Sequence, residues 1–414
     1  MKIVRFLVVL CMSLFMISRA FAGEIDVLVG KLVEKGILNE QDAKEVLAET
    51  KAEIKKQLEE GKLDTLPKWA QTTRFSGDLR FRFRNQDRAV VSDRNRLSFR
   101  FRYGFETKVN DKLKVGARLA TGSSSSQVTR EQPTTDSFSL RYIWLDLAYM
   151  EYSINKKAKI TGGKIKNPFY ATHDLIWDTN VTPEGMVAEY KTSFSHTDTK
   201  TDVSANLAVL PLDFDNNTSP VIYASQVVLS KDIFTRKLKT GVTYYDADSI
   251  KNGVYANITP NNSKQTNTLS GGKFVYDYNI VDVSAEYPVC EIKISDISLP
   301  VNLLGGYVKN FAPGVKKDTG WLAGFKLGKA QQKNSWDFSY NYRRLAADAV
   351  LDFLNDNTFH DGGTNSKGHK FSLKYIPLEN TEACLTNYYA KKISGIKTSG
   401  EVLDIIQLEF IAKF

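Results

Sequence analysis

Basic residues recur at every second position in three consecutive stretches of the sequence. They alternate with aromatic and aliphatic residues in "LRFRFRN", in "RLSFRFRYGF" and again in "KVGARL". Arg stays charged throughout the accessible pH range, and its planar set of N–H donors matches the oxygens of carboxylates and phosphates. The chemistry to expect is therefore attraction and orientation of anions. The basic residues are Arg80, Arg82, Arg84, Arg96, Arg100, Arg102, Lys114 and Arg118.

This spacing assigns the basic residues to extended strands. A strand has a side-chain period of two, so basic residues gather on one face, whereas a helix would distribute them around its circumference. We expect strands at residues 75–85, 95–106 and 112–121, with apolar residues such as Phe81 on the opposite face. The cations would then form one basic wall. A second interpretation stays open, in which they are solvated residues that pair with carboxylates such as Asp78.

The same period continues to the C-terminus and predicts an all-β protein. Strands of about ten residues, tilted by about 45°, are long enough to cross a lipid bilayer. The opposite register would place the basic residues in hydrocarbon, at about 2–4 kcal/mol each near the midplane. We therefore expect a transmembrane antiparallel β-barrel of about 16 strands. The expected strands are residues 75–85, 95–106, 112–121, 140–152, 158–165, 185–194, 202–210, 221–230, 237–246, 273–287, 299–310, 320–329, 335–345, 368–376, 382–393 and 402–414.

The connections between these strands give an independent signal. Short ones such as "VNDK" and "INKKA" alternate with long ones such as "GSSSSQVTREQPTTDS", with residues 288–298 as the clearest exception. Outer-membrane barrels have tight periplasmic turns and long outer loops. Many aromatic residues also stand near strand ends, where they predict girdles at the two membrane interfaces. They include Tyr103, Phe105, Tyr149, Tyr152, Tyr244, Tyr245, Tyr287, Tyr307, Phe311, Tyr340, Tyr342, Tyr388 and Tyr389.

The C-terminal strand ends on an aromatic residue. In "IIQLEFIAKF", Phe410 and Phe414 share the apolar face and the chain stops at Phe414. This pattern resembles the insertion signal of bacterial outer-membrane barrels, which implies the barrel-insertion machinery as a partner.

The N-terminal part differs in kind. Residues 1–22 combine basic residues, a short apolar run and Ala20-Phe21-Ala22, as in a secretory signal peptide. Residues 23–66 have helical spacing, with Asn39 as an N-cap followed by Asp42, and are expected to be periplasmic. They would form a helical hairpin or a self-associating coiled-coil segment. Residues 67–414 would form the barrel.

Several stretches together resemble the putative-porin family of Gram-negative bacterial outer-membrane proteins. They are "LRFRFRNQ" with "RNRLSFRFRYGFE", "KVGARLATG", "WLDLAYMEY", and "GGKIKNPFY" leading to "DLIWDTNVTPEGM". The resemblance covers essentially the whole mature chain. It implies an outer-membrane porin, a water-filled diffusion channel for small hydrophilic solutes, and a homotrimer, the usual arrangement of sixteen-strand porins. The basic wall would add a preference for anionic solutes.

The connection at residues 166–182 is a candidate constriction loop. In general porins the third outer loop folds into the barrel, and acidic residues on such a loop facing the basic wall would create a transverse field. A loop that only covers its own mouth is the alternative. The residues suited to a constriction are Phe169, Tyr170, Asp174, Trp177 and Asp178.

Other chemistry is not indicated. The four His never stand at zinc-site spacing, and no nucleophile-elbow or phosphate-loop motif is present, so we expect no enzyme, metal or cofactor. The modest basic excess predicts no nucleic-acid partner, and Cys290 and Cys384 are expected to be unpaired. The alternative function is a structural or adhesive outer-membrane barrel with a plugged lumen and periplasmic tethering helices.

Overall fold

The computed structural model describes residues 24–59, 67–88, 93–123, 126–135, 137–196, 199–213, 219–259, 265–294, 297–394 and 402–414. The signal peptide expected at residues 1–22 lies outside the described residues. The chain divides into two compact units, residues 1–71 and 72–414. None of the helices in the described part of the chain combines the length and the apolar character that crossing a membrane requires.

The first unit contains a helical hairpin, as one of the two alternatives predicted. Helix α2 (Glu24–Glu34) packs on helix α3 (Glu40–Glu59). The N-cap at Asn39 is confirmed, because its Oδ1 accepts the Asp42 backbone N–H at 2.8 Å. A short helix, α4 (Lys68–Gln71), precedes the first strand.

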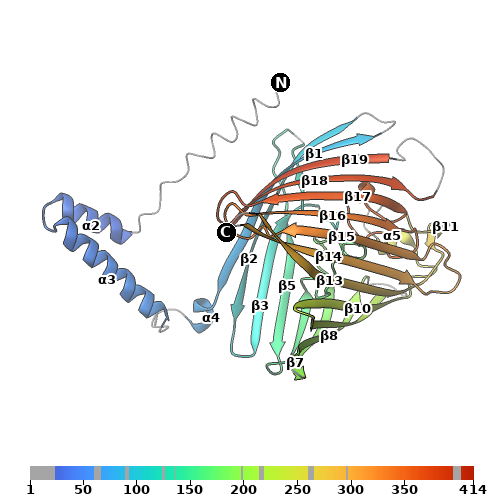
Figure 1. The fold of residues 1–414 in the computed structure, drawn as a ribbon, viewed down its shortest axis with the longest axis horizontal. Helices are drawn as coiled ribbons and strands as arrows, with labels where there is room; N and C mark the ends of the chain where they lie inside the picture. The colour runs from blue at the N-terminus through green and yellow to red at the C-terminus, as the bar shows by residue number, and fades with distance from the viewer. Residues whose placement is uncertain are drawn as a thin grey trace. The chain divides into compact units, whose positions relative to one another are not determined.

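The second unit is a closed antiparallel barrel of 16 strands (Figure 1). The first and last strands pair, with Arg80 opposite Ile411 and Phe81 opposite Phe410, and this pairing closes the barrel. All sixteen expected segments are strands. They are β1 (Arg74–Arg88), β2 (Arg94–Lys108), β3 (Leu113–Thr121), β5 (Ile143–Ser153), β6 (Ala158–Lys164), β7 (Glu184–His196), β8 (Thr199–Pro211), β9 (Val221–Ile233), β10 (Arg236–Asp248), β13 (Tyr278–Ile294), β14 (Ile297–Asn310), β15 (Thr319–Gly328), β16 (Trp336–Leu345), β17 (Ser366–Tyr375), β18 (Thr381–Lys392) and β19 (Val402–Lys413).

Residues 288–298, which stood out as the clearest exception to the alternation of short and long connections, are mostly strand. Strand β13 continues to Ile294, which pairs with Ile297 at the start of β14. A bulge between Pro288 and Cys290 shifts the phase of the alternation, which is why the sequence pattern is lost there. The connection between β13 and β14 is therefore a short turn, as the alternation of short and long connections requires at this position.

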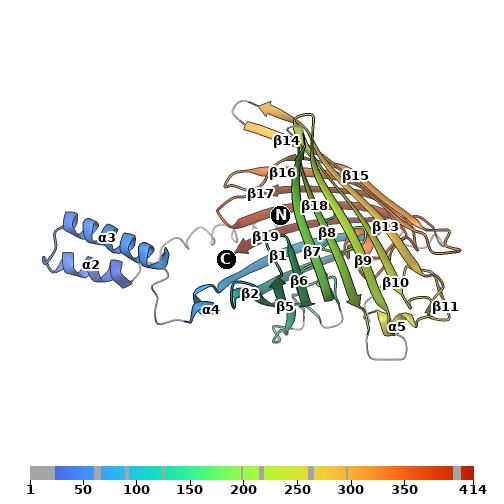
Figure 2. The same cartoon turned by 90° about the horizontal axis from the view of Figure 1, so that it is seen from below.

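The strand predicted to begin at Lys273 begins instead at Tyr278. Residues before it form a separate ribbon of β11 (Leu269–Ser270) and β12 (Lys273–Phe274). With the short helix α5 (Tyr255–Ile258), this ribbon lies at the end of the barrel away from the C-terminus (Figure 2). Two further short elements belong to the long loops: β4 (Gln132–Pro133), which pairs with β2, and the 3-10 turn η1 (Phe359–Asp361).

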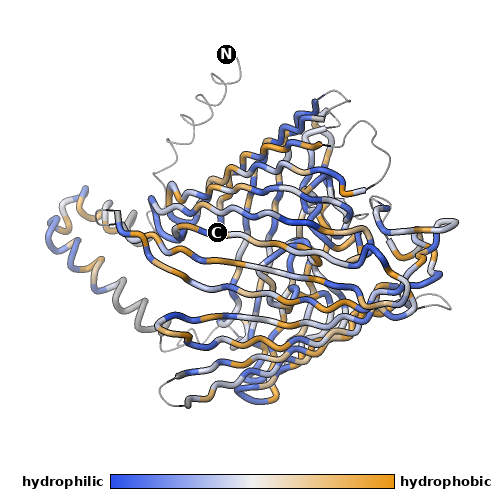
Figure 3. Tube along the Cα trace, turned by 45° about the vertical axis from the view of Figure 1, so that its right-hand side comes forward, coloured by the Kyte–Doolittle hydropathy of each residue, from blue (hydrophilic) through white to orange (hydrophobic). Residues whose placement is uncertain are grey.

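The two faces of the strands have opposite character. Apolar and polar residues alternate along each strand (Figure 3). On β1 and β2, Phe75 and Phe81 are 62% and 52% exposed, whereas Arg80 and Arg100 are 8% and 6% exposed. The strands therefore have the register that the alternation predicted, with aromatic residues outside and arginines inside.

Three aromatic residues expected in the girdles point inward instead. Tyr149, Tyr245 and Tyr388 are buried. Tyr244, which precedes Tyr245, and Tyr389, which follows Tyr388, are exposed. In a strand, adjacent residues must face opposite sides, so only one of each Tyr-Tyr pair can reach the membrane.

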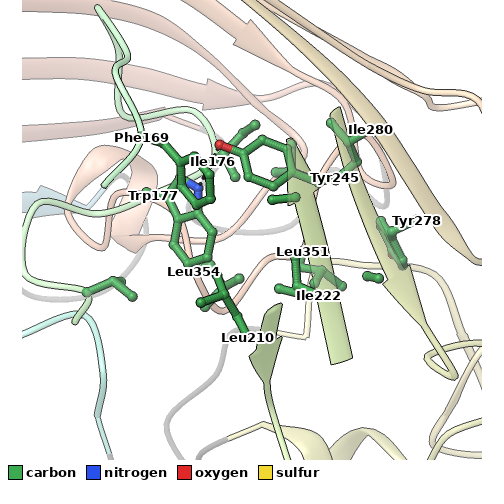
Figure 4. Packing of buried hydrophobic residues seen from close by; sticks show 14 of the residues in the cluster. Phe169, Ile176, Trp177, Leu210, Ile222, Tyr245, Tyr278, Ile280, Leu351 and Leu354 are labelled. Carbon is green, nitrogen blue, oxygen red and sulfur yellow. Dashed lines mark hydrogen bonds between the residues drawn. The ribbon is translucent and has the colours of Figure 1, made fainter. Parts of the chain in front are cut away.

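An apolar cluster fills one side of the barrel interior. It joins inward residues of β8, β9, β10 and β13 to two long loops (Figure 4). We call residues 165–183, between β6 and β7, the first inserted loop, and residues 346–365, between β16 and β17, the second inserted loop. Labelled members of the cluster are Phe169, Ile176, Trp177, Leu210, Ile222, Tyr245, Tyr278, Ile280, Leu351 and Leu354.

Candidate pore wall and inserted loops

The first inserted loop runs along the inner wall of the barrel. Near its start, the Asn206 side chain on β8 donates to the Pro168 carbonyl at 3.0 Å. Gln226 on β9 then makes two hydrogen bonds of 2.9 Å with the backbone of Tyr170. Because Asn206 and Gln226 belong to the buried face of their strands, the loop lies inside the barrel and does not only cover its mouth.

Farther along, the loop crosses to the next strands. The His173 Nε2 atom lies 3.0 Å from Asp282 Oδ1 and 3.1 Å from Ser284 Oγ, both on β13. Thr172 donates to the Gly305 carbonyl on β14 at 2.7 Å. These contacts hold the loop at the middle of its course.

Asp174 anchors the far end of the crossing. It forms ion pairs with Arg343 on β16 and with Lys370 on β17, the second at 2.9 Å. Both cations also contact Asp356 of the second inserted loop, Arg343 at 3.0 Å and Lys370 at 3.8 Å. This largely buried network joins the two inserted loops to strands β16 and β17. Sequence reasoning missed Arg343, Lys370 and Asp356, because nothing local marks them as partners of a loop some 170 residues earlier.

The aromatic residues of the first inserted loop serve packing. Phe169 makes an edge-to-face contact with Tyr245, with ring centroids 5.2 Å apart, and Trp177 donates to the Tyr245 hydroxyl at 3.1 Å. Tyr170 lies under the Lys239 ammonium group, 3.8 Å from the ring centroid. The loop is thus a packed element with a defined position.

The second inserted loop was not recognised as inserted from the sequence. Its Asp352 accepts the Tyr255 hydroxyl at 2.8 Å, and its Asp348 accepts the Thr268 N–H at 2.7 Å. Its Asp361 reaches β1, where Arg84 donates to it at 2.9 Å. The signal that was available is the apolar content of "AADAVLDFL", which is high for a solvated outer loop.

The basic wall is paired with carboxylates along β1 and β19. Glu409 lies 3.1 Å from Arg80 and 2.7 Å from Arg82. Arg80 also forms an ion pair with Glu131, which belongs to the loop before β5. Here two arginines share two carboxylates, so their formal charges balance.

The wall along β2 and β3 has more cations than carboxylates. Asp78 bridges Arg100 and Arg102, with N···O distances of 2.6 Å to each. Asp146 likewise bridges Arg118 at 2.7 Å and Arg130 at 2.6 Å. In the described ranges, these carboxylates are the only ion-pair partners of the four arginines, so each cluster keeps one positive charge in excess.

The accessible part of this wall lies on neighbouring strands. The side chains of Arg102 and Arg118 are 21% and 23% exposed, against 7% for Arg100. Arg118 is opposite Gly104 in the register of β2 and β3, two residues from Arg102. Lys114 pairs with Glu151 at 3.2 Å, and Arg96 has an interaction of its own.

The acidic residues of the first inserted loop do not face the basic wall, as the expected transverse field would require. Asp174 pairs with Arg343 on β16 and Lys370 on β17, and Asp178 is buried against the second inserted loop. The carboxylates that meet the wall come instead from Asp78, Glu131 and Glu409. Sequence reasoning placed the two loop acids on the right element but with the wrong partners.

Asp178 is a buried carboxyl beside a second one. Burial, and then the charge of Asp356, raise the pKa of Asp178 to about 7. Three hydrogen bonds act in the other direction, from the Asn180 N–H at 2.7 Å, from the Asn180 amide at 2.8 Å and from the Asn357 N–H at 3.1 Å. The junction of the two inserted loops therefore contains a group that titrates near neutral pH.

Within the described residues there is no cluster of three or more His, Cys, Asp or Glu suited to a metal ion. Cys290 and Cys384 are both free, as predicted.

Comparison with known proteins decides the family. A model described as a putative porin matches residues 87–277 and 278–414. The chain belongs to this family. No curated protein matched the sequence.

The structure is similar to solved structures of bacterial porins. OprB of Pseudomonas putida aligns with a TM-score of 0.54 at 12% identity, over 83% of this chain and 94% of that one. A Rhodopseudomonas blastica porin mutant aligns with a TM-score of 0.44 at 12% identity, over 83% and 100%. Salmonella typhi OmpF, in complex with daunomycin, has a TM-score of 0.46 at 10% identity, over 83% and 97%. The likeness to OprB shows the fold, and the family shows an outer-membrane porin channel.

The C-terminus of this porin completes the barrel seam. The Gly77 N–H donates to the Phe414 carbonyl at 2.7 Å, and the Phe414 N–H donates back at 3.1 Å. The Phe414 ring stacks on Phe101 and Tyr103, with centroids 6.4 and 6.5 Å apart. Phe410 lies opposite Phe81. These contacts surround the two residues of the expected insertion signal. That the insertion machinery recognises them stays a prediction.

Proposed function

We propose that this porin is a water-filled diffusion channel for small hydrophilic solutes with a weak preference for anions. The observation that carries the proposal is the charge excess of the Asp78 and Asp146 clusters, where each carboxylate is shared by two arginines. The preference is weak because most of the basic wall is paired.

Arg102 and Arg118 are the residues on which the preference depends. They are the more exposed arginines of the two clusters, and their unshared N–H groups are available to an anion. Rings or walls of basic side chains favour anions in pores. The apolar cluster occupies the side of the interior formed by β8, β9, β10 and β13, so the proposed path runs along the basic wall.

Reversal potentials in planar bilayers test the proposal. Under a KCl gradient, the wild type should show a potential of the sign expected for chloride preference. Arg102→Gln/Arg118→Gln should shift it toward the cation side. The control, Lys156→Gln/Lys157→Gln, removes the same charge from an exposed turn and should leave the potential unchanged.

Two results would contradict it. One is a folded wild type that prefers cations, and the other is a double variant with the selectivity of the wild type.

A plugged barrel is the second candidate, and one observation favours it. The apolar cluster with the two inserted loops occupies part of the interior, which is more bulk than a wide polar lumen would contain. A folded protein that does not conduct would support this candidate against the channel.

We propose the remaining assignments from the sequence pattern. Residues 1–22 would direct export, residues 23–66 would lie in the periplasm, and the barrels would associate as a homotrimer in outer-membrane lipid. Deletion of residues 23–66 tests whether the helices support the oligomer: cross-linking should detect fewer trimers, and an unchanged trimer would reject this role.

A further inference from the structure

Five basic residues gather at the loop end of the barrel without a carboxylate partner. They come from the loop before β15 and from three neighbouring strands. In the described part of the chain, no ion pair or side-chain hydrogen bond involves any of them, in contrast to the arginines of the interior. We call them the rim cluster: Lys316, Lys317, Arg344, Lys367 and Lys391.

Strand register places three of these residues in one row. Arg344 on β16 is opposite Lys367 on β17, which is opposite Lys391 on β18. They share a face with Tyr342, His369 and Tyr389, whose row is the next one toward the middle of the strands. Tyr389 is 47% exposed, so this is the outer, lipid-facing side of the barrel.

A pocket of about 240 Å³ opens beside this row. Lys316, Lys317 and Arg344 contribute its cations, and Thr319 and Ser394 contribute polar groups. One water occupies about 30 Å³ of liquid, so the space accommodates an oxyanion the size of phosphate.

Hydrogen bonds hold the walls of the pocket in place. The Asp348 N–H donates to the Lys317 carbonyl at 2.8 Å, and the Ala346 N–H donates to the Thr319 carbonyl at 2.9 Å. On the other side, the Ser394 hydroxyl donates to Asn365 Oδ1 at 3.1 Å. The cations are thus carried by ordered backbone that requires no ligand to form.

We propose that the rim cluster binds the phosphate-bearing headgroup of a lipid in the leaflet at the loop end of the barrel. Unpaired cations just beyond an aromatic row are at the depth of lipid headgroups, where aromatic side chains mark the interface. The phosphate enters the pocket between Lys317 and Arg344, and the acyl chains lie along the aromatic face below. The row of Lys367 and Lys391 carries a second anionic group of the same lipid.

Native mass spectrometry of the folded full barrel in detergent, titrated with diphosphoryl lipid A, tests this proposal. Lys317→Gln/Arg344→Gln/Lys367→Gln should bind the lipid about 100-fold more weakly, since each basic residue near an anionic surface contributes a factor of about five. Lys112→Gln/Lys156→Gln/Lys157→Gln removes the same charge at exposed turn positions and should bind like the wild type.

Two further arms identify the source of the phosphate. Lipid A without phosphate should bind wild type and rim variant equally weakly, and inorganic phosphate alone should not bind at concentrations where lipid A saturates. If the triple variant folds poorly, the exposed single change Lys317→Gln should weaken binding about five-fold.

Undiminished lipid A binding by the rim variants, or inorganic phosphate bound as tightly as lipid A, would overturn the proposal. An equal loss in the turn control would also overturn it.

Discussion

At the scale of single residues, His173 lies against the inner wall at a position that only glycine leaves open. A Cβ on Gly306 would stand 1.8 Å from the His173 ring. A Cβ on the neighbouring Gly305 would meet nothing closer than 3.8 Å. The wall thus contains a notch for the first inserted loop.

Gly306→Ala should displace His173 and lower the free energy of unfolding by about 1–3 kcal/mol, because overpacking a fitted contact forces side chains and backbone to move. Urea unfolding in lipid vesicles measures it. Gly305→Ala is the matched control and should unfold like the wild type. Equal effects of the two substitutions would contradict the fit of His173 to Gly306.

Asp178 predicts a pH dependence of the packed interior. Its pKa is raised to about 7 when folded, so the folded protein retains a proton that the unfolded chain releases near pH 4. The contribution of Asp178 to the free energy of unfolding is therefore fully present below about pH 4. It falls as the pH rises to about 7 and does not change further above that pH. Asp178→Asn should remove about 2–4 kcal/mol of this dependence.

Urea unfolding of wild type and Asp178→Asn at about pH 4.5 and about pH 8, one condition below and one above the raised pKa of about 7, measures this difference. Asp111→Asn, an exposed turn position, should keep the wild-type dependence. If the free energy of unfolding changes between the two pH values by the same amount in the wild type and in Asp178→Asn, the assignment is rejected.

The sequence predicted that the basic residues face the inside of the barrel, because the side-chain period of two assigns each residue to one face of its strand. One of the two interpretations also named Asp78 as a partner, and Asp78 does pair with Arg100 and Arg102. Pairs between strands far apart in the sequence could not be predicted. Arg82 and Glu409 stand 327 residues apart, and they meet only because the barrel closes.

At the scale of elements, the strands were predictable and the inserted loops only in part. Alternation identified all sixteen strands, and failed at Pro288 where a bulge breaks the phase. The insertion of residues 165–183 was predicted as one of two alternatives, whereas the partners of Asp174 depend on where β16 and β17 lie around the wall. The insertion of the second loop was not predicted, although its apolar residues are buried.

Asp174→Asn tests the junction of the two loops with the wall. It leaves Arg343 and Lys370 with Asp356 as their shared carboxylate partner among the described residues. Removing one member of a buried ion network should lower the free energy of unfolding by about 3 kcal/mol. Protease cleavage at Lys166 should also accelerate.

The control for this change is Asp111→Asn, which should change neither quantity. Wild-type stability together with wild-type cleavage in Asp174→Asn would show that the network does not hold the loop.

At the scale of the whole molecule, the barrel depends on its seam. Phe414 contributes two backbone hydrogen bonds to Gly77 and a ring stacked on β2. Each hydrogen bond contributes about 0.5–1.5 kcal/mol. Deletion of Phe414 should therefore lower the temperature at which the folded band disappears in heated electrophoresis, and reduce the yield of folded barrel in cells.

Phe414→Leu separates the two contributions, because it keeps the backbone pairing and loses the aromatic ring. Its heat stability should resemble that of the wild type. Its yield of folded barrel in cells should be lower, because the insertion signal requires the aromatic ring. A deletion variant with full yield and full heat stability would contradict both roles.

The central claim is that a conducting path remains beside the basic wall despite the two inserted loops. Single-channel recording of purified, folded protein in planar bilayers tests it most directly. The account predicts discrete ohmic steps, with a larger conductance in Asp174→Asn, in which the loops are released from the wall. Folded wild-type protein that inserts and gives no conductance steps would contradict it.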